Sequence, residues 1–160
     1  MPNYSTFKYG SGVLYGESYS AEPLVTSLFK DLIDNNWNSS NCTQPTVVLA
    51  NQSLRYNLDA GDYIIIRMIS PGEAETLKGP YSWYKKQMIA LQAEFHSATS
   101  RQRLYDLEKE FCRICYANIH SFSDYQKLRY QSFVDHQEQG MNIFKGTARI
   151  QVEGNILRAK

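Results

Sequence analysis

The sequence predicts an α+β fold, a two-layer sandwich in which a mostly antiparallel sheet of about five strands carries two helices on one face. Apolar residues recur every three or four positions near residues 24–33 and 104–118, the spacing of an amphipathic helix. Residues 89–96 alternate apolar and polar side chains, so one face of that strand is buried and the other is wet. Strand-like segments also follow one another directly, which favours antiparallel hairpins with both helices on one face.

Residues 1–20 differ from the rest and are predicted to be an N-terminal arm, followed by a single α+β domain over residues 21–160. The arm is rich in Gly and Ser and has too few aliphatic residues to form a core. It is either disordered or packs on a neighbouring subunit through its aromatic rings, which are Tyr4, Phe7, Tyr9, Tyr15 and Tyr19.

The first helix is expected to begin near Glu22-Pro23, because Pro suits the first helical turn, and to end near Trp37. A polar loop, residues 38–44, leads to a short strand over 47–50, a turn region over 51–61 and a β-branched strand from Tyr63 to Ile69. That last strand is apolar on both faces, so we expect it to be central in the sheet or covered by an oligomer neighbour.

A long loop over residues 70–83 carries Leu77, Tyr81 and Trp83 and leads directly into Tyr84. Loops of this length are usually functional or disordered, and large rings on a loop are either pinned to the subunit or offered to a partner. Tyr81, Trp83 and Tyr84 precede Lys85 and Lys86, a combination that can stack bases and hold phosphate. The alternative is a strand whose cationic edge resists aggregation.

The amphipathic strand that follows Tyr84 buries alternate residues, which are Ile89, Leu91, Ala93 and Phe95. Thr99 to Gln102 match a capping box, with a hydroxyl at the cap and Gln three residues later. The helix that follows has one apolar stripe, formed by Leu104, Leu107, Phe111, Ile114 and Asn118. Residues 127–135 and 142–153 are predicted to form a closing hairpin.

Charge and cysteine content narrow the class of protein. The formal net charge is +1, with 17 basic and 16 acidic residues, so the chain lacks the basic surplus of a dedicated DNA-binding protein. Three cysteines argue against a disulfide framework and fit a reducing compartment. No apolar run reaches the roughly 20 residues that span a membrane, and the N-terminus has no signal-peptide core, so we expect a protein kept in a cytoplasm.

We predict no catalytic, cofactor-binding or metal-binding residues, and therefore no enzyme. Cys112 and Cys115 have CxxC spacing, but they lie inside a helix on its apolar side and no second ligand pair exists for zinc. We expect both to be buried structural thiols. The histidines are scattered, and His96 falls on the outward face of its strand. The dispersed carboxylates indicate ordinary surface positions: Asp106, Glu108 and Glu110 on a solvated helix face beside Arg103 and Lys109, and Asp59 and Asp62 in a turn.

The order of elements resembles that of the tail-terminator, or tail-completion, proteins of tailed phages and related viruses. The resemblance covers roughly residues 22–155: a helix over Pro23–Trp37, a hairpin that ends in Tyr63-Ile-Ile-Ile-Arg and a long loop, then the strand Met88-Ile-Ala-Leu-Gln-Ala-Glu-Phe, the helix Arg101–Ile119 and a closing hairpin. The opening Phe-Lys-Tyr-Gly-Ser-Gly-Val-Leu-Tyr-Gly is similar to segments of phage tail proteins, although terminators usually begin close to their first helix.

The resemblance implies a structural virion protein of the neck, assembled in the host cytoplasm. It implies a homo-oligomeric ring, typically a hexamer, that caps the tail tube, receives the head connector and contacts DNA only as passing cargo. The expected interface residues are the five rings of the arm together with Leu77, Tyr81, Trp83 and Tyr84. Two alternatives are a nucleic-acid-binding module with a ferredoxin-like sheet and another structural component of the neck or tail.

Overall fold

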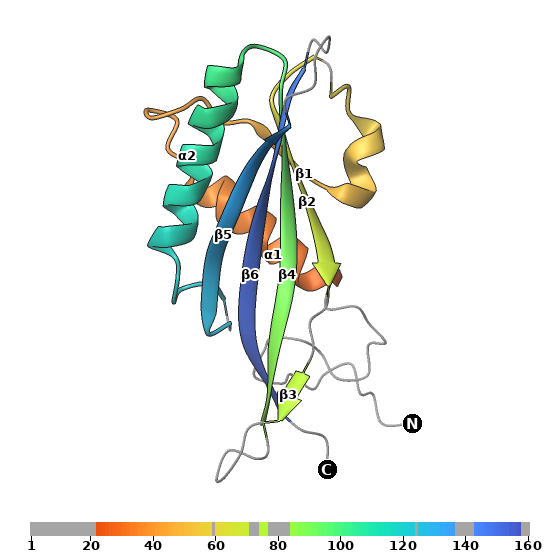
Figure 1. The fold of residues 1–160 in the computed structure, drawn as a ribbon, viewed down its shortest axis with the longest axis vertical. Coiled ribbons are helices and arrows are strands. Elements are labelled where there is room, and N and C mark those ends of the chain that lie inside the picture. The colour runs from red at the N-terminus through yellow and green to blue at the C-terminus, as the bar shows by residue number, and fades with distance from the viewer. Residues whose placement is uncertain are drawn as a thin grey trace.

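The computed structural model describes residues 22–58, 60–70, 74–76, 84–123, 125–136 and 143–157. The element order, shown in Figure 1, is α1 (Glu22–Asn36), β1 (Thr46–Leu49), η2 (Ala50–Arg55), β2 (Tyr63–Ser70), β3 (Ala74–Thr76), β4 (Tyr84–Ser97), α2 (Arg101–Ala117), β5 (Lys127–His136) and β6 (Phe144–Leu157). Here η2 is a turn of 3-10 helix.

One mixed sheet holds all the described strands, in the order β1-β2-β4-β6-β5, and β3 pairs separately with β4. The predicted α+β class is therefore confirmed, with one strand more than expected. The closing hairpin is also confirmed, because β5 and β6 pair antiparallel. Strand β6 extends to Leu157 and pairs with β4 along its whole length, from Tyr84↔Leu157 to Ser97↔Phe144.

Both helices pack on one face of the sheet and enclose a single core. In Figure 1, α1 crosses behind the strands while α2 runs alongside β5. The Phe29 ring of α1 meets the Phe111 ring of α2 edge to face, with centroids 5.7 Å apart, and the Phe111 ring lies 5.1 Å from that of Phe95 on β4. The predicted apolar positions of β4 and α2 are fully buried here, which are Ile89, Leu91, Ala93, Phe95, Leu104, Leu107, Phe111 and Ile114.

The expected hairpin between the first two strands is wrong, because β1 and β2 are parallel, with Thr46 opposite Tyr63 and Leu49 opposite Ile66. Parallel neighbours need a crossover connection of about a dozen residues, which a turn cannot supply. Residues 50–62 supply it, and η2 lies within them. The strand that is apolar on both faces is central, as predicted: β2 lies between β1 and β4. Its Ile65 and the neighbouring Val48 are buried on the face opposite the main core.

The N-cap of α2 is Ser100, one residue later than the Thr99 cap of the predicted capping box. Ser100 is the N-cap, and its hydroxyl accepts a hydrogen bond from the Arg103 backbone N–H over 3.1 Å. The residue at the third helical position is therefore Arg103, so the reciprocal bond expected from Gln102 cannot form. Gln102 donates instead to Asp106 one turn later.

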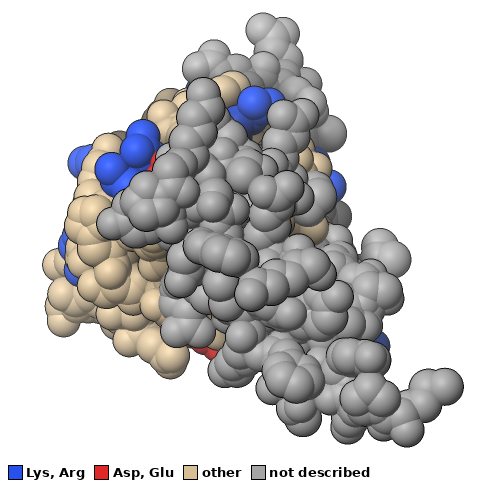
Figure 2. Space-filling view, turned by 90° about the horizontal axis from the view of Figure 1, so that it is seen from below, with Lys and Arg blue, Asp and Glu red and all other residues tan. Residues whose placement is uncertain are grey.

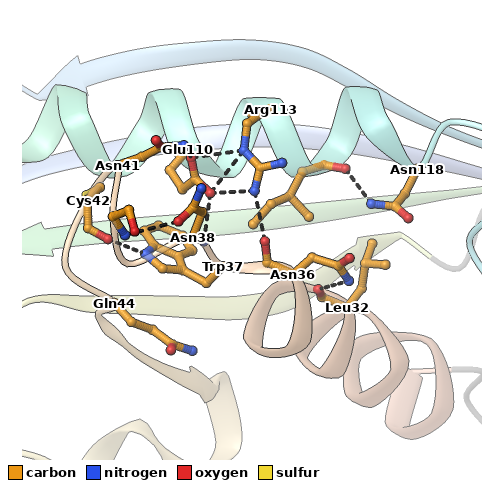
Figure 3. Close-up of polar contacts among 12 residues, drawn as sticks. Leu32, Asn36, Trp37, Asn38, Asn41, Cys42, Gln44, Glu110, Arg113 and Asn118 are labelled. Atoms are coloured by element: carbon orange, nitrogen blue, oxygen red, sulfur yellow. Dashed lines mark hydrogen bonds and ion pairs between the residues drawn. The ribbon is translucent and has the colours of Figure 1, made fainter.

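The prediction that Glu110 lies on a solvated face of α2 is also wrong, since its side chain is 3% exposed. Figure 3 shows the polar clasp around it, which joins α2 to the chain that follows α1. Arg113 Nε donates to both carboxylate oxygens over 3.0 Å, and the Asn38 backbone N–H and the Asn41 amide donate over 2.9 and 3.2 Å. The Arg113 guanidinium also donates to the Asn36 carbonyl over 2.8 Å.

A second junction ties the start of α2 to the sheet. Asp62, predicted to be a turn residue, accepts from Arg103 Nε over 2.8 Å and from the Ser97 hydroxyl over 2.9 Å. The Arg103 guanidinium also donates to Cys42 Sγ over 2.7 Å and to the Thr43 carbonyl. Arg103 is therefore a partly buried bridge between three segments, and the prediction of a solvated position for it is wrong.

Candidate interaction surface

The face of the sheet opposite the helices, called the open face below, is the candidate interaction surface. Because side chains alternate along each strand, the pairing register lines them up in rows across the sheet. From the upper end in Figure 1 downwards, the first three rows are Tyr63, His96, Lys145 and His136, then Ile65, Glu94, Thr147 and Val134, then Arg67, Gln92, Arg149 and Ser132. Below them come Ala90, Gln151 and Arg129, and then Met88, Glu153 and Lys127.

Glu94 is the centre of a polar cluster on this face. Arg67 Nη2 lies 2.8 Å from one carboxylate oxygen, and the Gln92 amide donates to the same oxygen over 3.2 Å. His96 Nε2 lies 3.9 Å from the other oxygen. The adjacent His96 ring and then the Arg67 charge lower the pKa of the Glu94 carboxyl, against the partial burial that raises it. Glu94 is therefore a carboxylate that its neighbours already neutralise.

A hollow of about 490 Å³ lies at the upper end of the open face, where β4, β5 and β6 run side by side. Its lining includes the polar residues Glu94, His96, His136, Lys145, Thr147 and Arg149. His136 Nε2 lies 2.7 Å from the Thr147 hydroxyl. His96 is 8% exposed, and its Nδ1 is buried with no hydrogen-bond partner among the described residues. The prediction that His96 points outward is right, but its expected surface position is wrong.

The lower end of the open face is more apolar. Ser70 stands opposite Ala90, the register of β2 shifts between Met68 and Ser70 so that Ile69 forms a bulge, and Met88 follows on β4. Ile69 is 48% exposed and Met88 is 37% exposed. Below Met88 the sheet narrows to β3, β4 and β6, and Figure 1 shows these strands continuing past both helices. Figure 2 views the molecule from this end, and Lys and Arg side chains stand out on the described surface visible there.

The predicted interface residues fall almost wholly outside the described part of the chain. This applies to Tyr4, Phe7, Tyr9, Tyr15, Tyr19, Leu77, Tyr81 and Trp83. Tyr84 begins β4, but its side chain is likewise outside the described set. Only part of the open face could be predicted from the sequence. Alternation gives the outward residues of β4 and β6, whereas the register that places Lys145 between His96 and His136 depends on long-range pairing.

The thiols of the CxxC pair are not activated. Burial raises the pKa of both Cys112 and Cys115, and Cys115 is 1% exposed, which agrees with the prediction of a structural thiol. Cys112 is only partly buried. Within the described ranges, no group of three or more His, Cys, Asp or Glu side chains is placed to hold a metal ion. No described helix is long and apolar enough to cross a membrane.

Comparison with known proteins adds no assignment: no protein-family model matches the chain, and no curated protein matches its sequence. Function is therefore inferred from the sheet of this chain and from the order of its elements.

Proposed function

We propose that this chain is a structural subunit of a homo-oligomeric ring at the head–tail junction of a tailed virus, where it caps the tail tube and receives the head connector. The observation that supports an assembly role most directly is the lower end of the sheet. There β4 and β6 run past the helices, and Ile69 and Met88 expose apolar surface beside them. The placement at a viral neck rests on the order of elements, which resembles that of tail terminators.

The lower end has the properties of a contact surface. The β4–β6 ladder is unbroken over all 14 residues of β4, so the protruding ribbon is anchored deep in the sheet. The last β6 residue that pairs with β5 is Glu153, so the segment from Gly154 to Leu157 has only β4 beside it among the described strands. A strand segment with one described neighbour can pair with another chain along its other edge, and adjacent apolar side chains mark contact sites.

A ring needs a contact between two different surfaces of neighbouring subunits, repeated until it closes. The lower end provides one such surface, distinct from the helical layer on the other side of the molecule. Its apolar residues are few, so we expect the ring to be completed or tightened by the tail tube and connector proteins.

The oligomeric state of the full chain tests this proposal. Light scattering after size-exclusion chromatography, with negative-stain imaging, should show a closed ring of discrete mass. The double variant Ile69→Arg, Met88→Arg should shift the mass toward monomer, because two buried charges in an apolar contact are costly. Tyr116→Arg is the matched control, since Tyr116 is 58% exposed on α2 in the helical layer. A wild-type protein that stays monomeric at high concentration, both alone and with the tail tube, would exclude the ring.

The second candidate, a nucleic-acid-binding sheet, is favoured by the cations of the open face, Lys145 and Arg149. In the described parts of β4 and β6, however, the open face carries no Tyr, Phe or Trp ring on which a base could stack, and Tyr63 on β2 stands at the end of its first row. This candidate then depends on Tyr63 and on the predicted rings Tyr81, Trp83 and Tyr84. It predicts salt-dependent oligonucleotide binding that Trp83→Ala weakens, and an absence of binding at low salt would remove it.

A further inference from the structure

We propose that the upper hollow of the open face binds an oxyanion of the phosphate class, with Lys145, Arg149 and His136 as ligands. This inference goes beyond the assembly role proposed above and does not depend on it. The ligand residues come from two adjacent strands, and β4 closes the hollow on its far side with His96 and Glu94.

The first argument is the sign of the charge in the hollow. His96, Lys145 and His136 lie side by side in one row, on three neighbouring strands. Lys145 and Arg149 both line the hollow and are permanently positive. Among the described lining residues the one carboxylate is Glu94, which is already engaged by Arg67. The hollow therefore carries positive charge that an anion in front of the row would balance.

The second argument is that the strongest donors lining the hollow are not used within the described structure. Neither Lys145 nor Arg149 has a hydrogen-bond or ion-pair partner among the described side chains, whereas Arg67, Arg103, Arg113 and Arg129 all have one. The two are four residues apart on β6 and point to the same face, with Thr147 between them. Long side chains in this arrangement can converge above the Thr147 hydroxyl.

The third argument concerns which anion fits. An arginine fork, an ammonium group, a hydroxyl and an imidazole are the groups that proteins use for phosphate oxygens. The first three come from β6 and the imidazole comes from β5, so they can reach different oxygens of one tetrahedral anion. The volume of about 490 Å³ is ample for a phosphate group with a substituent attached. The same chemistry serves a free phosphate ester and a phosphate of a nucleic-acid backbone.

Other polar groups face the two histidines of the hollow. His96 faces Glu94 on its own strand, Tyr63 on β2 and Lys145 on β6, and His136 faces Lys145 and Thr147. The histidine signals therefore report on the hollow, and sulfate is the cleanest probe of it because the charge of sulfate is constant around neutral pH.

The test uses the full chain with histidines labelled for NMR. Titration with sulfate, and separately with inorganic phosphate, should shift the His96 and His136 signals saturably with a dissociation constant of about 1 mM or tighter. Arg149→Gln and Lys145→Gln should each weaken binding about tenfold, the scale of one charge-assisted hydrogen bond.

Arg129→Gln is the matched control, because Arg129 lies on the same face but outside the hollow and is paired with Glu153 at 3.3 Å. Each variant is first checked for an unchanged melting temperature. If neither anion gives a saturable shift, or if Arg129→Gln weakens binding as much as Arg149→Gln, the site does not exist as proposed.

A third experiment distinguishes the two sources of the phosphate group, a free phosphate ester and a nucleic-acid backbone. An oligonucleotide that binds with a steep salt dependence, reduced by Arg149→Gln, identifies a nucleic-acid backbone, whereas saturation by inorganic phosphate without oligonucleotide binding identifies a free phosphate ester.

Discussion

Glu110 lies at a position that helical periodicity assigns to solvent, yet it is among the most buried charged groups described. The reason is the loop after α1, which folds over that part of α2 and supplies the Asn38 and Asn41 donors. These two donors and the Arg113 guanidinium satisfy the carboxylate, so the burial is tolerated. No pattern in the sequence links positions 69 to 77 residues apart, and for this reason the clasp could not be predicted.

We predict that Glu110→Gln lowers the free energy of unfolding at pH 7 by about 1–3 kcal/mol, because it removes the charge that Arg113 and the loop donors bind. Urea denaturation measures the change. Asp31→Asn, an exposed carboxylate on α1, is the control and should be nearly neutral. Equal effects of the two variants would mean that the clasp adds no stability.

The same residue predicts a pH dependence. The hydrogen bonds from Arg113, above all, lower the pKa of Glu110 in the folded protein, against the burial that raises it. Its contribution to stability is therefore complete above the unfolded pKa of about 4.3 and is lost as the pH falls through the lower, folded value. The stability difference between wild type and Glu110→Gln should shrink between pH 5 and acid pH. A constant difference over that range would show that the carboxylate charge is not what stabilises the fold.

Gly146 is a residue whose role only the structure reveals. A Cβ at this position would lie 2.3 Å from the end of the Phe133 ring, so the ring occupies the place where a side chain would stand. Phe133 in turn packs edge to face on Phe95, with centroids 5.7 Å apart. The ring therefore covers a glycine in the middle of the sheet and extends the core toward the β5 edge.

We predict that Gly146→Ala destabilises the protein by about 1–3 kcal/mol through overpacking. In the background of Phe133→Leu, the same change should cost much less, because the ring end that it meets is gone. A double-mutant cycle of thermal melts measures the coupling. Additive effects would contradict the contact.

At the scale of elements, local signals predicted the existence of the helices and long strands but not how they connect. Apolar periodicity gave α1, α2 and the buried side of β4, since it reflects the one face that each element buries. The parallel β1–β2 pair was missed because a 13-residue connection containing η2 has the polar composition of a turn. Only packing distinguishes a crossover from a loop.

Two substitutions at the start of α2 distinguish the predicted N-cap, Thr99, from the observed N-cap, Ser100. Ser100→Ala should destabilise the protein by about 1 kcal/mol, the usual effect of losing an N-cap hydroxyl. Thr99→Ala should be nearly neutral, because Thr99 is exposed and its side chain does not cap the helix. Chemical denaturation of the two single variants decides the point. A larger effect at Thr99 would restore the capping box first expected.

At the scale of the whole molecule, the fold class and the one-sided helical layer could be predicted, whereas the rows of the open face could not. Alternation alone showed that Gln92, Glu94 and His96 point away from the core. It could not show that Lys145 and His136 stand beside His96, because that neighbourhood joins strands that are far apart in the chain. Both proposals made for this protein depend on such long-range register.

The sheet order leads to a prediction for the molecule as a whole. Strands β4 and β6 each have neighbours on both sides over most of their length, while β1 and β5 have one described neighbour each. Backbone amides of β4 and β6 in the sheet centre should therefore exchange only through global unfolding, and those of β1 and β5 through local opening. Hydrogen–deuterium exchange by mass spectrometry on a monomeric variant should show protection that falls from the centre to both edges. If the wild-type protein assembles as proposed, the lower ends of β4 and β6 should gain protection that the Ile69→Arg, Met88→Arg variant lacks. Protection of β5 instead would place the subunit contact at the other edge of the sheet and would contradict the assembly surface proposed here.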